Sequence, residues 1–349
     1  MKNILFFHPV NDYTGSTRVL SNIISKEYKD IPVTIITIDE KGLLSNLPNA
    51  KIIPILILQN KYPKIKFICN LIEKIHLILI TMFYGIQHKH IYINTILPYY
   101  AACIAKLLGK KPTYHIHEYF LIKNKKIKIA EFIFNHISSN RIFVSQYVKN
   151  CYKERKDSPC IIKYNTLSET FLEQISYKPI ENRNKNTITM LASLSTFKGI
   201  SLFVSCAEAL PQYKFQLIIS SNHMNIMEFF KNELLQDKLP NNLYIYPSQS
   251  NIHPFLRDTD ILLNLTNPAC CIETFGMTIL EAISYGIPAI VPNIGGPIEI
   301  IENEYNGYCI DVSNKDLVIK KISDILSNQE LYCKLSYNAL EMFNKKFNK

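Results

Sequence analysis

Two glutamates and a helix start within one apolar segment have the spacing to bind a phosphorylated sugar. Seven residues separate Glu273 from Glu281, and residues 277–285 have the pattern of a short helix that begins near Thr274 and Gly276. A helix N-terminus presents free N–H groups and the positive end of the helix dipole, which suits a phosphate. A carboxylate in the preceding loop and another two turns into the helix can accept hydrogen bonds from the vicinal hydroxyls of a sugar.

The alternative for these glutamates is purely structural, with one capping the helix and one in solvent, because glutamate is a common helix former. The apolar sequence on both sides predicts a buried helix, which leaves the two carboxylates few other roles. We therefore favour the binding site.

A lysine and a glycine follow the first predicted strand of the second half of the chain. At that turn, Lys198 before Gly199 can neutralise a diphosphate as it becomes a leaving group. The alternative is a surface lysine, which is the commonest fate of this residue type.

The first half of the chain has a glycine loop at the corresponding turn. Gly15 permits close backbone approach to a ligand, and Ser16 follows it. An ordinary turn in which Ser16 or Thr17 caps the next helix is the alternative, and both can hold.

A histidine and a glutamate end another predicted strand of the first half. His117 and Glu118 close the run 113–117. A lone histidine is more often structural, so no general-base role follows from this pattern. We expect His115 to point to the other face of the strand.

Strands and helices alternate in both halves, which predicts parallel sheets covered on both faces. The predicted strands are 3–8, 32–38, 52–58, 90–94, 113–117, 141–145, 187–194, 215–220, 243–246, 261–265 and 289–291. The predicted helices are 18–28, 65–85, 99–108, 126–137, 200–210, 224–235, 275–285, 316–326 and 330–347. The fold class is α/β with two Rossmann-like domains, whose ligands bind at the carboxyl ends of the strands.

The 349 residues suit about two domains at roughly 150 residues each. Residues 177–186 are polar and aperiodic, which predicts a linker. The expected domains are therefore 1–176 and 187–330, followed by a helical stretch at 331–349.

The charge is uneven along the chain. Residues 1–178 hold 25 Lys and Arg against 12 Asp and Glu, a net of +13, whereas residues 179–349 hold 14 against 17, a net of −3. The basic half predicts an anionic partner.

Three groups of lysines favour an anionic membrane surface as that partner: those at 61–66, at 110–111 and at 123–128, the last beside an apolar stripe. The alternative, that these lysines only form a solvated helix face, is equally common. Nucleic acid is disfavoured, since no RNP, helix-turn-helix or zinc-finger pattern occurs.

The remaining composition is that of a globular protein. Apolar residues make up 47% and charged residues 19%, which excludes a mainly disordered chain. No run of ~20 apolar residues occurs, so no membrane-spanning helix is expected, and the N-terminus turns polar too soon for a signal peptide. The 9 cysteines show no CxxC spacing, which predicts reduced thiols in a cytoplasmic protein.

The segment 272–296 resembles the E-x7-E signature of retaining nucleotide-sugar glycosyltransferases of family 4, which have the GT-B fold. The pairs Phe275-Gly276 and Glu281-Ala282 fall where that family has them, as do the motifs at 286–288 and 295–297. Less specific matches cover nearly the whole chain, at Lys198-Gly199, Gly15-Ser16, His117-Glu118 and 258–265.

The resemblance implies two Rossmann-like domains that face across a cleft, the first for an acceptor and the second for a nucleoside-diphosphate sugar. It implies retention of anomeric configuration, no bound metal and no cofactor. Residues 331–349 would pack back on the first domain. The implied acceptor is a lipid-linked glycan or surface-polysaccharide precursor, used at the inner face of the plasma membrane.

The resemblance also implies a role for each site residue. Glu273 would contact donor sugar hydroxyls, Glu281 the ribose, and Lys198 the leaving diphosphate. The N–H groups around Phe275 and Gly276 would hold phosphate, His117 would lie by the donor sugar, and Gly15 and Ser16 would lie near the donor phosphate and the acceptor. One position departs from the family: Ser193 stands where an arginine often provides a second phosphate contact.

Two other functions stay open at this point. A nucleotide-sugar epimerase of the same fold would need additional acid/base carboxylates, and a catalytically silent sugar-nucleotide-binding module would not need Lys198, Glu273 and Glu281 intact. A NAD-dependent dehydrogenase is disfavoured, because no G-x-G-x-x-G follows a strand.

Overall fold

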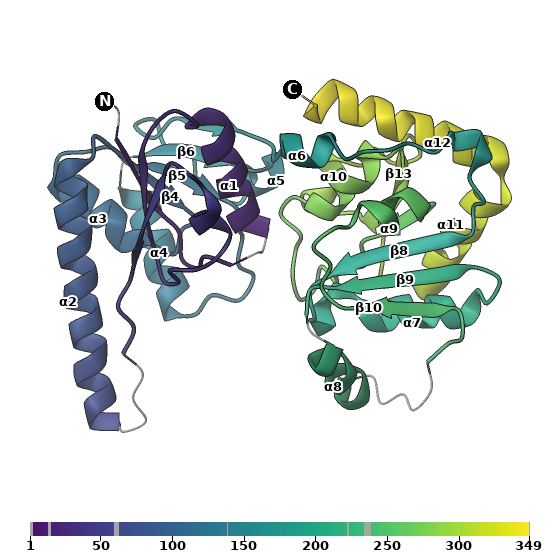
Figure 1. The fold of residues 1–349 in the computed structure, drawn as a ribbon, viewed down its shortest axis with the longest axis horizontal. Coiled ribbons are helices and arrows are strands. Elements are labelled where there is room, and N and C mark those ends of the chain that lie inside the picture. Colours follow the sequence, from purple (N-terminus) through teal and green to yellow (C-terminus); the bar gives the residue numbers. More distant parts are fainter. Residues whose placement is uncertain are drawn as a thin grey trace. The chain divides into compact units, whose positions relative to one another are not determined.

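The computed structural model describes residues 3–12, 15–58, 63–137, 139–221, 223–233 and 239–348. The chain divides into two compact units, Met1–Tyr164 and Asn165–Lys349, and each is an α/β unit built on a parallel sheet (Figure 1).

The sheet of the first unit has seven parallel strands in the order β3-β2-β1-β4-β5-β6-β7. The strands are β1 Ile4–Phe7, β2 Val33–Thr37, β3 Ala50–Pro54, β4 His90–Asn94, β5 Thr113–Ile116, β6 Asn140–Phe143 and β7 Cys160–Ile162. The helices are α1 Gly15–Glu27, α2 Pro63–Gln87, α3 Tyr99–Leu107, α4 Lys125–His136 and α5 Gln146–Asn150.

Strands β1 and β2 lie inside this sheet, where helices cover both faces. All residues of β1 and β2 are buried. Helix α1 links β1 to β2, and α2 links β3 to β4, which is the opposite direction across the sheet. Because both crossovers are right-handed, the two helices lie on opposite faces. On its face α2 packs on α3, and α3 packs on α4.

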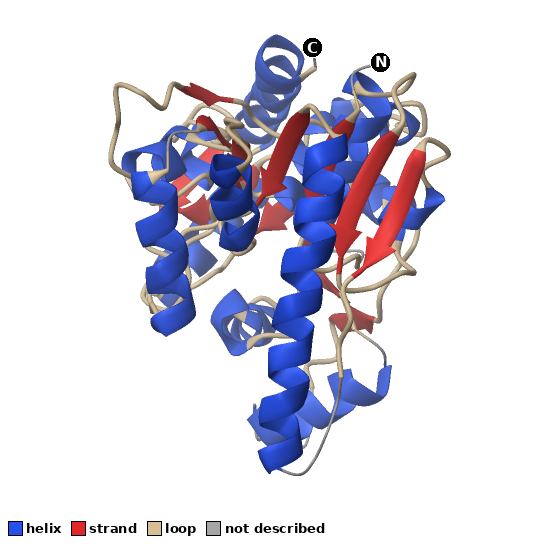
Figure 2. Cartoon of the chain, turned by 90° about the vertical axis from the view of Figure 1, so that its left-hand side faces the viewer, coloured by secondary structure: helices blue, strands red, loops and turns tan. Residues whose placement is uncertain are grey.

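The expectation that no helix could span a membrane is not met by helix α2. Its part Ile68–Gln87 is long and apolar enough to do so by length and composition. Only Thr81 and Gly85 of these residues are buried, and the helix runs past the end of the sheet (Figure 2).

The sheet of the second unit has six parallel strands in the order β10-β9-β8-β11-β12-β13. The strands are β8 Thr187–Ala192, β9 Lys214–Ile219, β10 Leu243–Tyr246, β11 Ile261–Leu263, β12 Ala289–Pro292 and β13 Gly307–Ile310. The helices are α6 Glu169–Leu172, α7 Ile200–Ala209, α8 His223–Glu233, α9 His253–Asp258, α10 Met277–Ser284, α11 Lys315–Ser327 and α12 Gln329–Met342, which continues as a π-helix over Phe343–Phe347. Its core includes Phe203 and Phe215, whose rings meet edge to face at 5.3 Å.

The first unit ends earlier than predicted, and the predicted linker is wrong. Residues 165–176 belong to the second unit, where the ring of Phe171 lies 4.3 Å from that of His253. Within 177–186, Arg183 is buried and donates to the carbonyl oxygens of Tyr285 (2.6 Å) and Gly286 (2.9 Å). Polar composition could not reveal this, because a segment held by tertiary hydrogen bonds resembles a solvated linker.

The predicted alternation is confirmed, with differences at short elements. Five short elements, each of six residues or fewer, have no counterpart among the predicted ones: β7, β13, α5, α6 and α9. The end of the predicted helix 224–235 and part of the lysine cluster 61–66 lie outside the described residues. The known contacts of α12 are with elements of the second unit, and its predicted packing on the first stays a prediction.

Candidate active site

Three loops of the second unit meet at the point where its strand order reverses. In the sheet, β8 lies beside β11, and β11 beside β12, so the loops that follow these strands share one edge. Those loops carry Lys198, Glu273 and Gly295. This switch point is where open parallel sheets bind ligands.

The central contact of this edge is an ion pair between Lys198 and Glu273. The Lys198 Nζ lies 2.7 Å from the Glu273 Oε2, and both side chains are about one-quarter exposed, at 22% and 23%. A lysine and a carboxylate held together and open to solvent can bind opposite ends of a sugar diphosphate, the lysine taking phosphate oxygens and the carboxylate taking hydroxyls.

Glycines allow these loops to approach closely. Gly199 has a φ of 79°, and a Cβ there would lie 2.2 Å from the Leu265 carbonyl oxygen. Gly295 has a φ of 93°, and its Cβ would lie 2.4 Å from the Glu273 carbonyl oxygen. The Gly296 N–H donates to that same oxygen at 2.8 Å. The glycine pair therefore holds the loop that carries Glu273.

Helix α10 begins directly after this loop. Gly276 precedes it with a φ of 107°, which favours glycine, and the N–H groups of Ile279 and Leu280 bond the Gly276 carbonyl. Phe275 is buried, its ring 6.2 Å from that of Phe347 in the π-helix, so this turn is packed from behind. Glu281 lies just over one turn into α10, less far than expected, and is 6% exposed.

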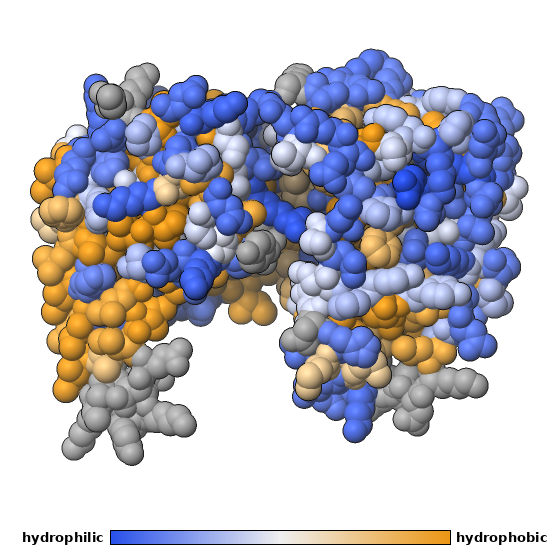
Figure 3. Space-filling model, viewed as in Figure 1, coloured by the Kyte–Doolittle hydropathy of each residue, from blue (hydrophilic) through white to orange (hydrophobic). Residues whose placement is uncertain are grey.

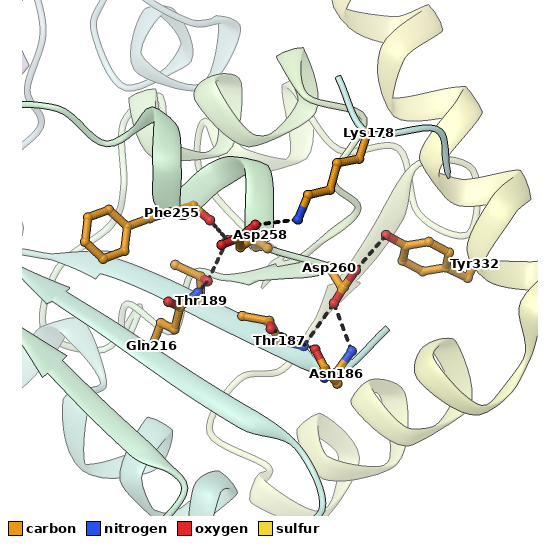
Figure 4. A network of polar contacts seen from close by, with 10 residues as sticks. Lys178, Asn186, Thr187, Thr189, Gln216, Phe255, Asp258, Asp260 and Tyr332 are labelled. Atoms are coloured by element: carbon orange, nitrogen blue, oxygen red, sulfur yellow. Dashed lines mark hydrogen bonds and ion pairs between the residues drawn. The ribbon is translucent and has the colours of Figure 1, made fainter. Parts of the chain in front are cut away.

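One Asp-x-Asp sequence in the chain, Asp258-Thr259-Asp260, bears on the expectation that no metal is bound. Figure 4 shows both carboxylates occupied by protein groups. Asp258 pairs with Lys178. Asp260 accepts from the N–H groups of Asn186 (2.8 Å) and Thr187 (2.9 Å) and from the Tyr332 hydroxyl (3.3 Å), and burial raises the pKa of its carboxyl. This motif ties the start of β8 to α12 and is structural.

No arginine takes the place that Ser193 leaves, within the residues described for the second unit. Ser193 is exposed. Arg183 is bound to the Tyr285 and Gly286 carbonyls, and Arg257 lies in α9, which ends before β11. Lys198 is a cation that this edge of the sheet does present.

In the first unit, a hydrogen-bonded chain crosses the ends of β1, β4 and β5. Thr17 donates to Asp12 Oδ1 at 2.6 Å, so its Oγ1 accepts from His8 Nε2 at 3.0 Å. The other His8 nitrogen, Nδ1, then accepts from Asn94 Nδ2 at 3.0 Å, and Asn94 Oδ1 accepts from His117 Nε2 at 2.8 Å. This assignment follows from the network, and it makes Nδ1 the acceptor nitrogen of a neutral His117.

Burial keeps both histidines neutral. It lowers the pKa of His8 to about 4 and that of His117 to about 3. The rings of His115 and His117 lie 4.1 Å apart, so the prediction that they point to opposite faces is wrong: residues two apart share a face. A neutral His117 can accept a hydrogen bond from a hydroxyl, and its low pKa disfavours proton abstraction.

The neighbouring glutamate titrates in the opposite sense. Glu118 accepts from the N–H groups of Ile96 (3.1 Å) and His117 (3.2 Å), yet burial raises the pKa of its carboxyl to about 7. Gly15 and Ser16, at the start of α1, lie beside this network, since the Ser16 carbonyl accepts from Asn94 Nδ2 at 3.5 Å. Among the described residues, no atom lies within 4 Å of where a Cβ at Gly15 would stand, so they leave space there.

These shifts predict opposing effects of acid on stability. The raised pKa of Glu118 adds to the free energy of unfolding below the unfolded pKa, and this contribution is lost as the pH rises through about 7. The lowered pKa values of His8 and His117 add to the free energy of unfolding above about pH 6.5. Their contributions are lost as the pH falls toward about 4 and 3. We expect Glu118→Gln to remove the first effect. Between pH 7 and pH 5 its stability should then fall more steeply than that of the wild type, by up to about 1.4 kcal/mol per pH unit.

Melting temperatures at several pH values across this range measure the difference. Glu40→Gln, at an exposed position, is the control and should follow the wild type. Parallel curves for wild type and Glu118→Gln would contradict a raised pKa at Glu118.

Comparison with known proteins agrees with this geometry. The family model of Glycosyl transferases group 1 matches residues 173–342, which include all three loops described above. The second unit belongs to the glycosyl transferases group 1 family. An uncharacterized glycosyltransferase of Methanocaldococcus jannaschii is 26% identical over 351 residues, covering 95% of this chain and 90% of that protein.

Solved structures confirm the GT-B fold for the glycosyltransferase. HepE of Anabaena in complex with UDP-glucose matches with a TM-score of 0.80 at 17% identity, covering 99% of this chain and 95% of that one. WaaG, a glycosyltransferase involved in lipopolysaccharide biosynthesis, matches with a TM-score of 0.72 at 11% identity, covering 98% and 95%. At these identities the likeness concerns the fold.

Proposed function

We propose that this glycosyltransferase moves a sugar from a nucleoside-diphosphate sugar to an acceptor hydroxyl with retention of anomeric configuration. The observation that carries the proposal is the Lys198–Glu273 pair at the switch point of the second unit. HepE, which shares the fold, binds UDP-glucose, and a uridine nucleotide sugar is the first donor to test.

Each residue has a role that follows from its chemistry and place. Lys198 neutralises the diphosphate as it leaves, aided by the N-terminus of α10 after Phe275 and Gly276. Glu273 accepts hydrogen bonds from the donor sugar, and Glu281 accepts them from the ribose. In the first unit, His117 accepts from a sugar hydroxyl, and the space at Gly15 and Ser16 admits the donor phosphate and the acceptor.

The acceptor we propose is a lipid-linked glycan or another surface-polysaccharide precursor, used at the cytoplasmic face of the plasma membrane. Two observations support it: the net charge of +13 over residues 1–178, and the fold shared with WaaG, which is involved in lipopolysaccharide biosynthesis.

Sugar transfer by the purified protein tests the proposal. A thermal-shift screen of nucleotide sugars first identifies the donor, since a ligand that binds the folded state raises its apparent stability. Transfer to an acceptor supports a transferase, conversion of one nucleotide sugar to another would show an epimerase, and binding without turnover would show a silent module.

We expect activity to survive EDTA. Lys198 and the dipole of α10 supply positive charge at the diphosphate, and the carboxylates of Asp258 and Asp260 are occupied by protein groups. Initial rates with and without chelator measure this. Loss of turnover that Mg²⁺ or Mn²⁺ restores would show instead that a metal takes part.

A further inference from the structure

Helix α2 of the first unit presents its more apolar side to solvent. Nine large apolar residues of this outward stripe are 38–64% exposed: Ile68, Leu71, Ile72, Ile75, Ile78, Leu79, Met82, Phe83 and Ile86. They recur every three or four residues, so they lie along one side of the helix. Figure 3 shows this apolar surface over α2.

The side of α2 that faces the protein is less apolar than the outward stripe. It contains Glu73, Leu77, Thr81 and Gly85, spaced four residues apart. Glu73 accepts from the Leu58 N–H at 2.5 Å, Thr81 donates to the Leu77 carbonyl, and Gly85 lies against Leu108 of the α3 end. Surface helices normally have the reverse arrangement, so the outward stripe indicates a partner.

We propose that the outward stripe of α2 inserts into the surface of an anionic lipid bilayer. This rests on the proposed function, in which the acceptor is used at the plasma membrane, and names the element that would contact the bilayer. The helix lies in the plane of the interface, with its stripe among the acyl chains.

The sheet excludes a transmembrane orientation of α2. The helix connects β3 to β4, and both belong to one sheet, because β3 pairs with β2, β2 with β1, and β1 with β4. Both ends of α2 must therefore lie on the same side of a membrane. The helix passes the length and composition test for a span, but its connections permit only a surface position.

Charge favours an anionic bilayer as the occupant. Glu73 and Lys74 are the only charged residues of Ile68–Gln87; Lys74 is exposed, whereas Glu73 is held by the Leu58 N–H. Helix α3, which packs on α2, adds the exposed Lys106, and α4, which packs on α3, adds the exposed Lys125, Lys126 and Lys128. Lys123, by contrast, is paired with Glu131 at 2.9 Å.

A second copy of this chain fits the outward stripe less well. Its first half would bring another net charge of +13 to the same surface. Helix pairs also flank their apolar seam with charged residues that set the pairing, whereas here the outward stripe continues at those positions with apolar residues such as Leu71 and Ile78.

Co-sedimentation of the full chain with vesicles tests the proposal. Wild type should bind vesicles of phosphatidylcholine and phosphatidylserine, more weakly at high salt and more weakly to phosphatidylcholine alone. The double variant Leu79→Glu with Phe83→Glu should bind at least about tenfold more weakly. It loses two apolar side chains that would be buried among the acyl chains, and the anionic lipid surface repels the two new carboxylates. Met224→Glu with Met227→Glu, exposed on α8 of the second unit, is the matched control and should bind as wild type does.

A fluorescent reporter tests insertion directly. The chain has no tryptophan, so Phe83→Trp gives a single reporter on the outward stripe. Its emission should shift to the blue with anionic vesicles and be quenched by brominated acyl chains. Emission that stays unchanged in vesicles would overturn insertion.

Two further results would overturn the proposal. The first is that the double variant Leu79→Glu with Phe83→Glu binds vesicles as strongly as the wild type does. The other is a vesicle-independent dimer that this variant dissociates, which would assign the stripe to a second copy. Hydrolysis of a soluble nucleotide sugar should be equal in both double variants and the wild type, so failure of the membrane contact is distinct from failure of the proposed activity.

Discussion

Replacing Lys198 with alanine is expected to lower the rate of sugar transfer by roughly 10²- to 10³-fold, the usual loss when one preorganised charge-stabilising group is removed. Its ammonium lies 2.7 Å from the Glu273 carboxylate at the carboxyl edge of the sheet. The negative charge of the diphosphate grows as the sugar leaves, so the lysine stabilises the transition state more than the bound donor. Turnover should therefore fall more than donor affinity.

Steady-state kinetics with calorimetric donor affinity separate these effects. Lys178→Ala, which removes an exposed lysine of the same unit from its pair with Asp258, is the control and should keep turnover within about twofold. A double-mutant cycle with Glu273→Gln should be non-additive, because both changes break one contact. Full turnover in Lys198→Ala would show that the ion pair is only structural.

Replacing Glu281 with glutamine is expected to weaken nucleotide-sugar binding by roughly 10- to 150-fold. That factor corresponds to a lost hydrogen bond to a charged group, about 1.5–3 kcal/mol. Glu281 is 6% exposed, so glutamine is preferable to alanine, which would also leave a cavity.

Calorimetric titration with the donor measures this change, and an unchanged melting temperature shows that the fold is intact. Glu228→Gln on α8, at an exposed position, is the matched control. Donor affinity equal to that of the wild type would remove Glu281 from the binding site.

The fold was predictable because each element carries its own local signal. Strands such as β4 and β10 were predicted with their observed bounds, since continuous apolar runs between turn residues have few other structures. Very short strands such as β7 were not, because three residues carry too little periodicity. The boundary at Tyr164 was missed for a different reason, since hydrogen bonds of Arg183, invisible in composition, fix the following segment to the second unit.

For the candidate site, the sequence by itself determined the residue types and their place on loops and helix starts. It could not predict the contact of Lys198 with Glu273, 75 residues away, or the hydrogen-bonded chain from Asp12 through Asn94 to His117. Such contacts depend on the order of the strands in the sheet. The same limit applies to α2: its apolar composition is local, but only the packing of Glu73 and Gly85 against the protein decided that the apolar side faces outward. Local pattern specifies what a segment can bury, and tertiary packing decides which of its sides is buried.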